Sequence, residues 1–249
     1  MVLQAQEGRL TTSAGRILVA TAVPAERDAV ALAFPDGTTE VRLPGTTLLR
    51  TAAGYDLLAA GVGPALAAAG TATALTAAAL DGHPYTLAVS AGIAGGFQPE
   101  APVGSLVVAD EITAADLGAE TADGFLPVTE LGFGTVSHRP PNSLVRVTTQ
   151  VTGARQGAVL TVSTTTGTAV RAAALRTRHP GALAEAMEGF GVAEAAAAHG
   201  VPVLELRAVS NPVGPRDRAA WRIGAALAAL TEAFGKLVPA LESWNQHDQ

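Results

Sequence analysis

A glutamate, an arginine and an asparagine stand close together in the C-terminal third of the sequence. Glu188 lies in a segment, residues 182–198, whose Ala, Leu, Met and Glu content predicts a helix. Residues 201–209 then alternate apolar with polar or small side chains, as a strand with one buried face does. This strand carries Arg207 and ends near Asn211. Because open α/β sheets bind ligands beyond the carboxyl ends of their strands, we expect Asn211 at a ligand site.

Further polar groups follow other predicted strands. Glu26 comes just after the apolar run 16–22, at the start of a helix, and Ser90 and Gly92 open a glycine-rich stretch after another apolar run. Glycines at this density let a backbone approach a ligand closely. Taken singly, such residues are more often dipole-stabilising carboxylates or turn residues. Together they predict a polar pocket floor at the strand ends.

A hydroxyl-rich turn adds to this floor. Residues 158–162 read as a strand that runs into Thr166 and Gly167, and we expect this turn to contact a ligand. Ser90 also sits one residue short of the nucleophile elbow of serine hydrolases. That alternative needs an aspartate and a histidine at later strand ends, and His138 and His199 are poorly placed for it.

The composition excludes several classes of protein. The chain has 249 residues, no cysteine, a net charge of −6 and only 15% charged residues. Disulfides and metal–thiolate sites are therefore impossible, and the acidic balance argues against nucleic acid as a partner. The histidines lack metal-ligand spacing, and we expect neither a metal nor a cofactor. The high apolar content, 48%, suits a large core and a homo-oligomer.

The chain divides into a short extension and one domain. Residues 1–15 are polar, lack the apolar run of a signal peptide and are predicted to be disordered, which favours a cytoplasmic protein. The uncharged stretch 57–80 reads as a strand, a glycine turn and a helix rather than a membrane span, because glycines, a proline and threonines interrupt it. Residues 16–249 are expected to form a single α/β domain.

The pattern also predicts the remaining elements. A hairpin is expected at 48–51 and 55–60, a further strand at 103–109 and a polar flap at 112–136. Helices are expected at 169–176 and 218–241, and Asp217 is a natural N-cap for the last of them.

Four stretches resemble the purine nucleoside phosphorylase/5′-methylthioadenosine nucleosidase family. They are SAGIAGG at 90–96, PVGSLVVADEI at 102–112, AMEGFGVAEA at 186–195 and LRAVSNPVGPRD at 206–217. The likeness is greatest to the branch that hydrolyses futalosine, a nucleoside of menaquinone biosynthesis, to hypoxanthine and dehypoxanthine futalosine. The resemblance implies a mixed, twisted sheet flanked by helices, and a purine nucleoside as substrate.

The resemblance also implies roles for individual residues. Glu26 matches the glutamate that orients and deprotonates water, Glu188 the one that grips the ribose hydroxyls, and Arg207 the support of the water site. Cleavage of an N-glycosidic bond passes through a transition state that resembles an oxocarbenium ion, and such carboxylates stabilise it. Met187 and Phe190 fall within the same binding motif, and we expect both at the substrate.

Two departures from the family pattern narrow the substrate. Asn211 stands where adenine-specific nucleosidases have aspartate, and an amide offers both a donor and an acceptor, which suits N7 and O6 of a 6-oxopurine. Near Glu26 and the first glycine turns, Arg27 is the only arginine, which favours water over phosphate as the nucleophile. Trp221 is expected to line the 5′ side of the pocket, with Arg216 near a substrate carboxylate.

Four alternatives remain at the level of the sequence. A methylthioadenosine-type nucleosidase or a nucleoside phosphorylase would use the same family pocket. A serine hydrolase would use Ser90. A non-catalytic protein on this fold would bind nucleosides without releasing the base.

Overall fold

The computed structural model describes residues 15–244. The expected N-terminal extension, residues 1–15, lies outside this part of the chain except for Gly15. The strands are β1 (Arg16–Thr21), β2 (Thr38–Leu43), β3 (Thr46–Thr51), β4 (Tyr55–Ala59), β5 (Tyr85–Gly96), β6 (Leu106–Ala114), β7 (Gly118–Thr121), β8 (Gly124–Pro127), β9 (Ser137–His138), β10 (Arg155–Thr161), β11 (Ala182–Ala186) and β12 (Val203–Pro212). The helices are α1 (Pro24–Ala31), α2 (Pro64–Leu80), α3 (Asn142–Thr152), α4 (Ala169–Arg178), α5 (Gly189–Ala198), a 3-10 turn at Arg218–Ala220 and α6 (Ile223–Ser243).

A mixed sheet organises the domain, with strand order β11-β10-β6-β12-β5-β1-β4-β3-β2. β5 runs parallel to both β1 and β12, whereas β12 runs antiparallel to β6. The far strand of the order, β11, returns to pair antiparallel with the last residues of β5. Five strands, β5, β12, β6, β10 and β11, therefore close into a ring. The predicted α/β fold with a mixed sheet is confirmed.

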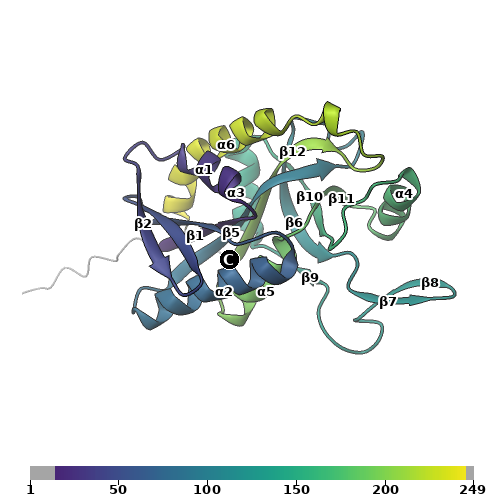
Figure 1. Ribbon diagram of the computed structural model, residues 1–249, viewed down its shortest axis with the longest axis horizontal. Helices are drawn as coiled ribbons and strands as arrows, with labels where there is room; N and C mark the ends of the chain where they lie inside the picture. Colours follow the sequence, from purple (N-terminus) through teal and green to yellow (C-terminus); the bar gives the residue numbers. More distant parts are fainter. Residues whose placement is uncertain (1–14, 245–249) are drawn as a thin grey trace, which may run out of the picture.

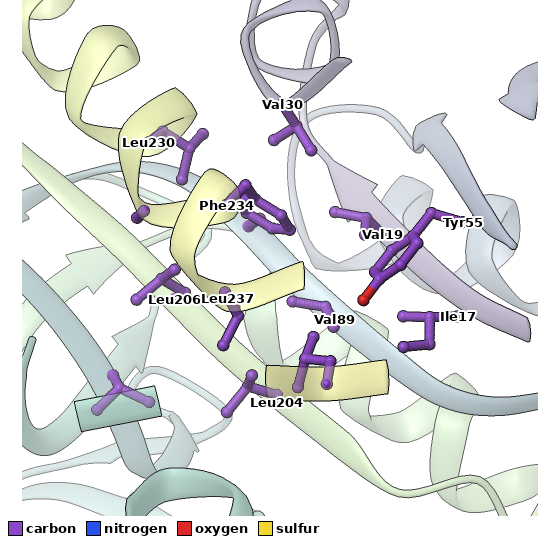
Figure 2. Close-up of a cluster of buried hydrophobic side chains, with 14 of the residues drawn as sticks. Ile17, Val19, Val30, Tyr55, Val89, Leu204, Leu206, Leu230, Phe234 and Leu237 are labelled. Carbon is purple, nitrogen blue, oxygen red and sulfur yellow. The ribbon is translucent and has the colours of Figure 1, made fainter. Parts of the chain in front are cut away.

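Helices cover both faces of the sheet (Figure 1). α1, α3 and α6 lie on one face, and α2 and α5 lie side by side on the other. The first face holds the largest core cluster, in which Leu230 and Phe234 of α6 point toward Val19, Val89 and Leu206 of the strands (Figure 2). On the other face, alanines of α2 and α5 let these helices approach the sheet closely.

Helix α6 is the one helix in residues 15–244 that is long and apolar enough to cross a membrane by length and composition. Its buried side chains, among them Leu230, Phe234 and Leu237, belong to the core of the domain. The uncharged stretch 57–80 forms the end of β4, a glycine turn and α2, as predicted.

The largest error of the sequence reading concerns residues 182–198. The predicted helix begins only at Gly189, because residues 182–186 form β11 between β10 and the end of β5. Good helix formers are thus held in a strand by tertiary pairing, which overrides propensity.

Smaller differences follow the same pattern. The glycine-rich stretch after Ser90 continues β5 instead of turning. The flap predicted at 112–136 contains the end of β6 and a separate two-stranded sheet, β7-β8. Asp217 caps the 3-10 turn through the backbone N–H of Ala219, and α6 starts six residues later than Asp217.

Candidate active site

Glu26 lies in the first turn of α1, directly after β1. Its Oε1 accepts a hydrogen bond from the Ile93 backbone N–H at 2.8 Å, and its Oε2 accepts from the backbone N–H groups of Ala22 at 3.0 Å and Val23 at 3.3 Å. The side chain is 4% exposed. These contacts hold the carboxylate in place between α1 and β5.

Burial raises the pKa of Glu26. The positive charge of Arg207 and the Ile93 amide oppose this rise, and the negative charge of Glu188 adds to it. A carboxyl with a raised pKa is a stronger base once it is ionised, which is how active sites prepare a general base.

Glu188 is the N-cap residue of α5, one residue before the helix, and not a residue within it as predicted. Its Oε1 accepts from the Gly63 backbone N–H at 3.2 Å, so it joins α5 to the glycine turn before α2. Its Oε2 accepts from the guanidinium of Arg207 at 3.4 Å and from the backbone N–H of Met187 at 3.3 Å.

Arg207 is the fully buried centre of this cluster. Its Nε donates to Glu205 Oε1 at 2.8 Å, Nη1 faces Glu188, and Nη2 donates to Ser90 Oγ at 3.0 Å. Burial would lower the pKa of this guanidinium, but the charges of Glu205, Glu188 and Glu26 outweigh burial and raise it. One cation therefore stands among three carboxylates.

The contact with Arg207 argues against a nucleophilic Ser90. Its hydroxyl accepts a hydrogen bond from a permanently charged donor, and Ser90 lies in the middle of β5 and is fully buried. A nucleophilic serine needs a neighbouring base and an exposed position on a strand-to-helix turn. Ser90 meets neither condition and instead supports Arg207.

Gly92 pairs with Arg207 between β5 and β12. A Cβ at this position would lie 2.6 Å from Glu26 Oε1 and 2.7 Å from Arg207 Nη1. The missing side chain therefore leaves the space in which the carboxylate and the guanidinium face each other.

A second group of predicted residues surrounds Gly95. In the sheet, Gly95 pairs with Asn211 of β12 on one side and with Glu185 of β11 on the other. Glu185 accepts hydrogen bonds from the backbone N–H of Thr166 at 2.7 Å and from its hydroxyl at 2.5 Å. The closed ring of strands thus brings the Thr166 turn and Asn211 to opposite sides of one glycine.

The side-chain amide of Asn211 is held at both ends. Its Oδ1 accepts from Ser210 Oγ at 2.8 Å and its Nδ2 donates to the Pro212 carbonyl at 3.0 Å. A second proton on Nδ2 and a second lone pair on Oδ1 remain for a ligand. Asn211 therefore keeps one donor and one acceptor that its protein contacts do not use.

Trp221 lies beside two arginines after the end of β12. The guanidinium of Arg216 lies 5.3 Å from the centre of the indole ring and that of Arg218 lies 5.7 Å away. Arg216 also donates to Thr165 Oγ1 at 3.2 Å and packs against Gly167. The structure thus joins the predicted Trp221 to the hydroxyl-rich turn.

Phe190, in the first turn of α5, is buried. Its ring centre lies 5.4 Å from that of His138, and its backbone N–H donates to Thr161 Oγ1 at 2.9 Å. Met187 is half-buried and touches the site through its backbone N–H.

Sequence reading missed Glu205 and Glu185 as members of the site. Glu205 was visible as a charged residue two positions before Arg207, and Glu185 lay hidden in a segment that predicted a helix. The backbone donors of Gly63 and Ile93 carry no side-chain signal. Within residues 15–244, no group of three histidine or acidic residues could hold a metal ion.

The chain belongs to the phosphorylase superfamily, whose family model matches residues 16–241. Among its relatives are futalosine hydrolases. That of Streptomyces coelicolor is 78% identical over 94% of this chain and 99% of the relative. That of Acidothermus cellulolyticus is 47% identical over 88% and 89% of the two chains.

Solved structures share the fold at low sequence identity. The native futalosine hydrolase of Helicobacter pylori superposes with a TM-score of 0.78 at 17% identity and covers 91% of this chain and 98% of its own. A 5′-methylthioadenosine/S-adenosylhomocysteine nucleosidase of Neisseria meningitidis in complex with methylthio-immucillin-A gives the same TM-score at 18% identity, over 91% and 99% of the two chains.

Proposed function

We propose that this protein hydrolyses the N-glycosidic bond of futalosine, a nucleoside of menaquinone biosynthesis, and releases hypoxanthine and dehypoxanthine futalosine. The observation that carries the proposal is the 78% identity to a futalosine hydrolase over nearly the whole chain. The cluster of Glu26, Glu188 and Arg207 supplies the chemistry.

Glu26 acts as the general base. Its carboxylate lies within the buried cluster and its pKa is raised, so it can take a proton from a water molecule as that water attacks the anomeric carbon. Glu188 binds the ribose hydroxyls and counters the positive charge that develops on the sugar ring. Arg207 holds Glu188 and Ser90 in place around this water site.

The charge of the cluster favours water over phosphate as the nucleophile. Three carboxylates face Arg207, so its positive charge is already balanced. A phosphate dianion placed beside Glu26 would meet uncompensated negative charge in a buried site, which is strongly unfavourable. A nucleoside phosphorylase is therefore the weaker proposal.

Asn211 and the Thr166–Gly167 turn bind the leaving base from the two sides of Gly95. The Nδ2 group of Asn211 donates to O6 of the base, and its Oδ1 accepts from N7 when N7 takes up a proton as the base leaves. Trp221 stacks on the aromatic part of the 5′ substituent, and Arg216 faces its carboxylate. Met187 and Phe190 complete the ribose side.

The proposal includes a homo-oligomer and a cytoplasmic protein that needs no metal and no cofactor. Exposed apolar side chains at Val62, Leu66 and Phe133 support an oligomer. The net charge of −6 supports the absence of nucleic acid from its partners.

Product analysis with futalosine, inosine and methylthioadenosine side by side tests the function. We expect free hypoxanthine from futalosine at a rate that phosphate does not change. Release of adenine from methylthioadenosine as the fastest reaction would point to the other nucleosidase class, and a requirement for phosphate would point to a phosphorylase. Binding of futalosine without release of base would show a non-catalytic protein.

Base choice is tested at Asn211. Asn211→Asp should shift preference toward the 6-amino counterpart of futalosine, most clearly at mildly acidic pH, where the new carboxyl holds a proton. A mismatched buried donor at the exocyclic position costs about 1–3 kcal/mol, which sets the size of the discrimination. Rapid cleavage of the 6-amino nucleoside by the unaltered protein would show that Asn211 does not read O6.

A further inference from the structure

Glu205 is the third residue of β12, two positions before Arg207, and is fully buried. Only one of its two oxygens has a partner: Oε1 accepts from Arg207 Nε at 2.8 Å. Among the described residues, three buried side-chain atoms have no hydrogen-bond partner, Thr71 Oγ1, Thr148 Oγ1 and Glu205 Oε2, and Glu205 is the ionisable one. A half-satisfied buried carboxylate is costly and calls for a reason.

The carboxylate packs against the start of α5. A Cβ at Gly189 would lie 2.2 Å from Glu205 Oε2 and 2.3 Å from Oε1, so the glycine after Glu188 is the residue that makes room for Glu205. Glu205 therefore touches both the guanidinium at the centre of the cluster and the backbone that carries Glu188.

The contact with Nε fixes the guanidinium plane. A guanidinium presents its donors in a rigid fork, so the position of Nε decides where both terminal nitrogens point. With Nε on Glu205, Nη1 faces Glu188 at 3.4 Å and Nη2 donates to Ser90. Without this contact, the fork is free to turn toward Glu188 or Glu26.

We propose that Glu205 is a positioning residue of the hydrolytic site: it orients Arg207 and sets the distance between β12 and Glu188 without touching the substrate. This inference rests on the proposed function. It also assigns a charge effect to Glu205. While Glu205 is ionised it balances Arg207, so Glu26 feels less of the cation and remains a stronger base. The charged groups around Arg207 are Glu205 of β12, Glu26 of α1 and Glu188 at the start of α5.

Two substitutions separate orientation from charge. Glu205→Val removes the acceptor, and we expect kcat for futalosine to fall about 10²-fold with a much smaller change in KM, because misplacing a catalytic support affects the transition state most. Glu205→Gln keeps an acceptor for Arg207 Nε and should restore most of kcat.

The pH profile of Glu205→Gln supplies the second readout. The loss of one negative charge leaves the Arg207 cation less balanced, which lowers the pKa of Glu26. The acid limb of kcat/KM, which reports the base of the free enzyme, should therefore move to lower pH. Asp56→Asn, which alters a buried carboxylate that also binds arginines but lies near the opposite end of β1, should leave the limb in place.

Hypoxanthine release by the unaltered protein tests the proposed function separately from these variants. The positioning role is wrong if Glu205→Gln recovers no more activity than Glu205→Val, or if the acid limb of the Gln variant does not move. It is equally wrong if neither variant folds, because Glu205 would then be a structural partner of Arg207 alone.

Discussion

The domain contains two buried clusters of carboxylate and arginine, at opposite ends of β1. In the first cluster, Asp56 of β4 binds two arginines: Arg16, the first residue of β1, and Arg50, whose Nε lies 3.0 Å from Asp56 Oδ1. Asp56 also accepts a hydrogen bond from the Tyr85 hydroxyl at 2.6 Å. Beyond the last residue of β1, a single Arg207 faces Glu26, Glu188 and Glu205. The first cluster has more donors than acceptors, and the second has more acceptors than donors.

Because the ratio of arginines to carboxylates differs between the clusters, the pKa of Asp56 shifts in the opposite direction from the pKa values of Glu26 and Glu205. Burial alone would raise the pKa of Asp56, but hydrogen bonds from Arg50 and Tyr85 and the charge of Arg16 outweigh burial and lower it. For Glu26 and Glu205, burial prevails and the pKa rises. A satisfied cluster stabilises the fold, whereas a carboxylate-rich one retains basic groups for chemistry.

The largest expected effect is at Glu26. Glu26→Gln should lower turnover of futalosine by about 10²–10⁴-fold, the usual contribution of a general base, because an amide cannot accept the proton of water. Asp56→Asn is the matched control and should keep near-normal turnover. Steady-state kinetics on both folded variants checks this, and equal losses would erase the distinction between the clusters.

Glu188→Ala should lower kcat by about 10²-fold, in the range found when one electrostatic contact to a developing charge is removed. The effect on KM should be smaller, since the ribose carries its positive charge only near the transition state. Single-turnover rates together with binding of a non-hydrolysable analogue measure the two parts. A loss limited to binding would mean that Glu188 recognises the ground state.

Gly92→Ala should disturb the cluster around Arg207 without adding or removing charge. The new methyl group would push Glu26 Oε1 and Arg207 Nη1 apart, and misplacement of this kind lowers rates by up to about 10²-fold. Gly54→Ala, next to the Asp56 cluster, meets open space but adopts a φ of 81°, so it should lower the melting temperature and leave the rate unchanged. A melting-temperature and rate measurement on each variant distinguishes the two sites.

The smallest effect concerns stability and pH at Asp56. The lowered pKa means that its ion pairs stabilise the fold above the unfolded-state pKa, and that this contribution disappears as pH falls through the folded-state pKa. Asp56→Asn should cost about 1–3 kcal/mol in the free energy of unfolding at neutral pH. Denaturation in urea should show that this difference narrows in acid. A constant difference down to the lowest pH at which the protein folds would contradict the assignment.

Local signals in the sequence predicted the local parts of the structure. The hairpin of β3 and β4, helix α2 and helix α4 follow from short-range pattern and turn residues, and all three are confirmed. The pattern also placed Glu26 correctly at the start of a helix that follows a strand, and Arg207 correctly within a strand.

The errors of the sequence-based prediction arise where pairing with strands distant in the sequence determines the structure of a segment. β11 is rich in helix formers, yet it pairs with β10 and β5 and turns Glu185 inward to hold Thr166. The glycines of β5 were expected to admit a ligand, but a Cβ at Gly96 would lie 2.1 Å from the Ala101 carbonyl, so chain packing also requires them. Glu205 gave no local signal of its half-satisfied pairing.

The candidate site draws its parts from both ends of the chain, and this has a consequence for synthesis. Glu26 is held by Ile93, 67 residues later, and the serine that accepts from Arg207 precedes it by 117 residues. At about 5–20 residues per second, Arg207 leaves the ribosome roughly 10–40 s after Glu26. Throughout that interval the nascent chain carries Glu26 without Arg207, the cation that acts on it in the folded domain, so the cluster around Arg207 is among the last features of the domain to form.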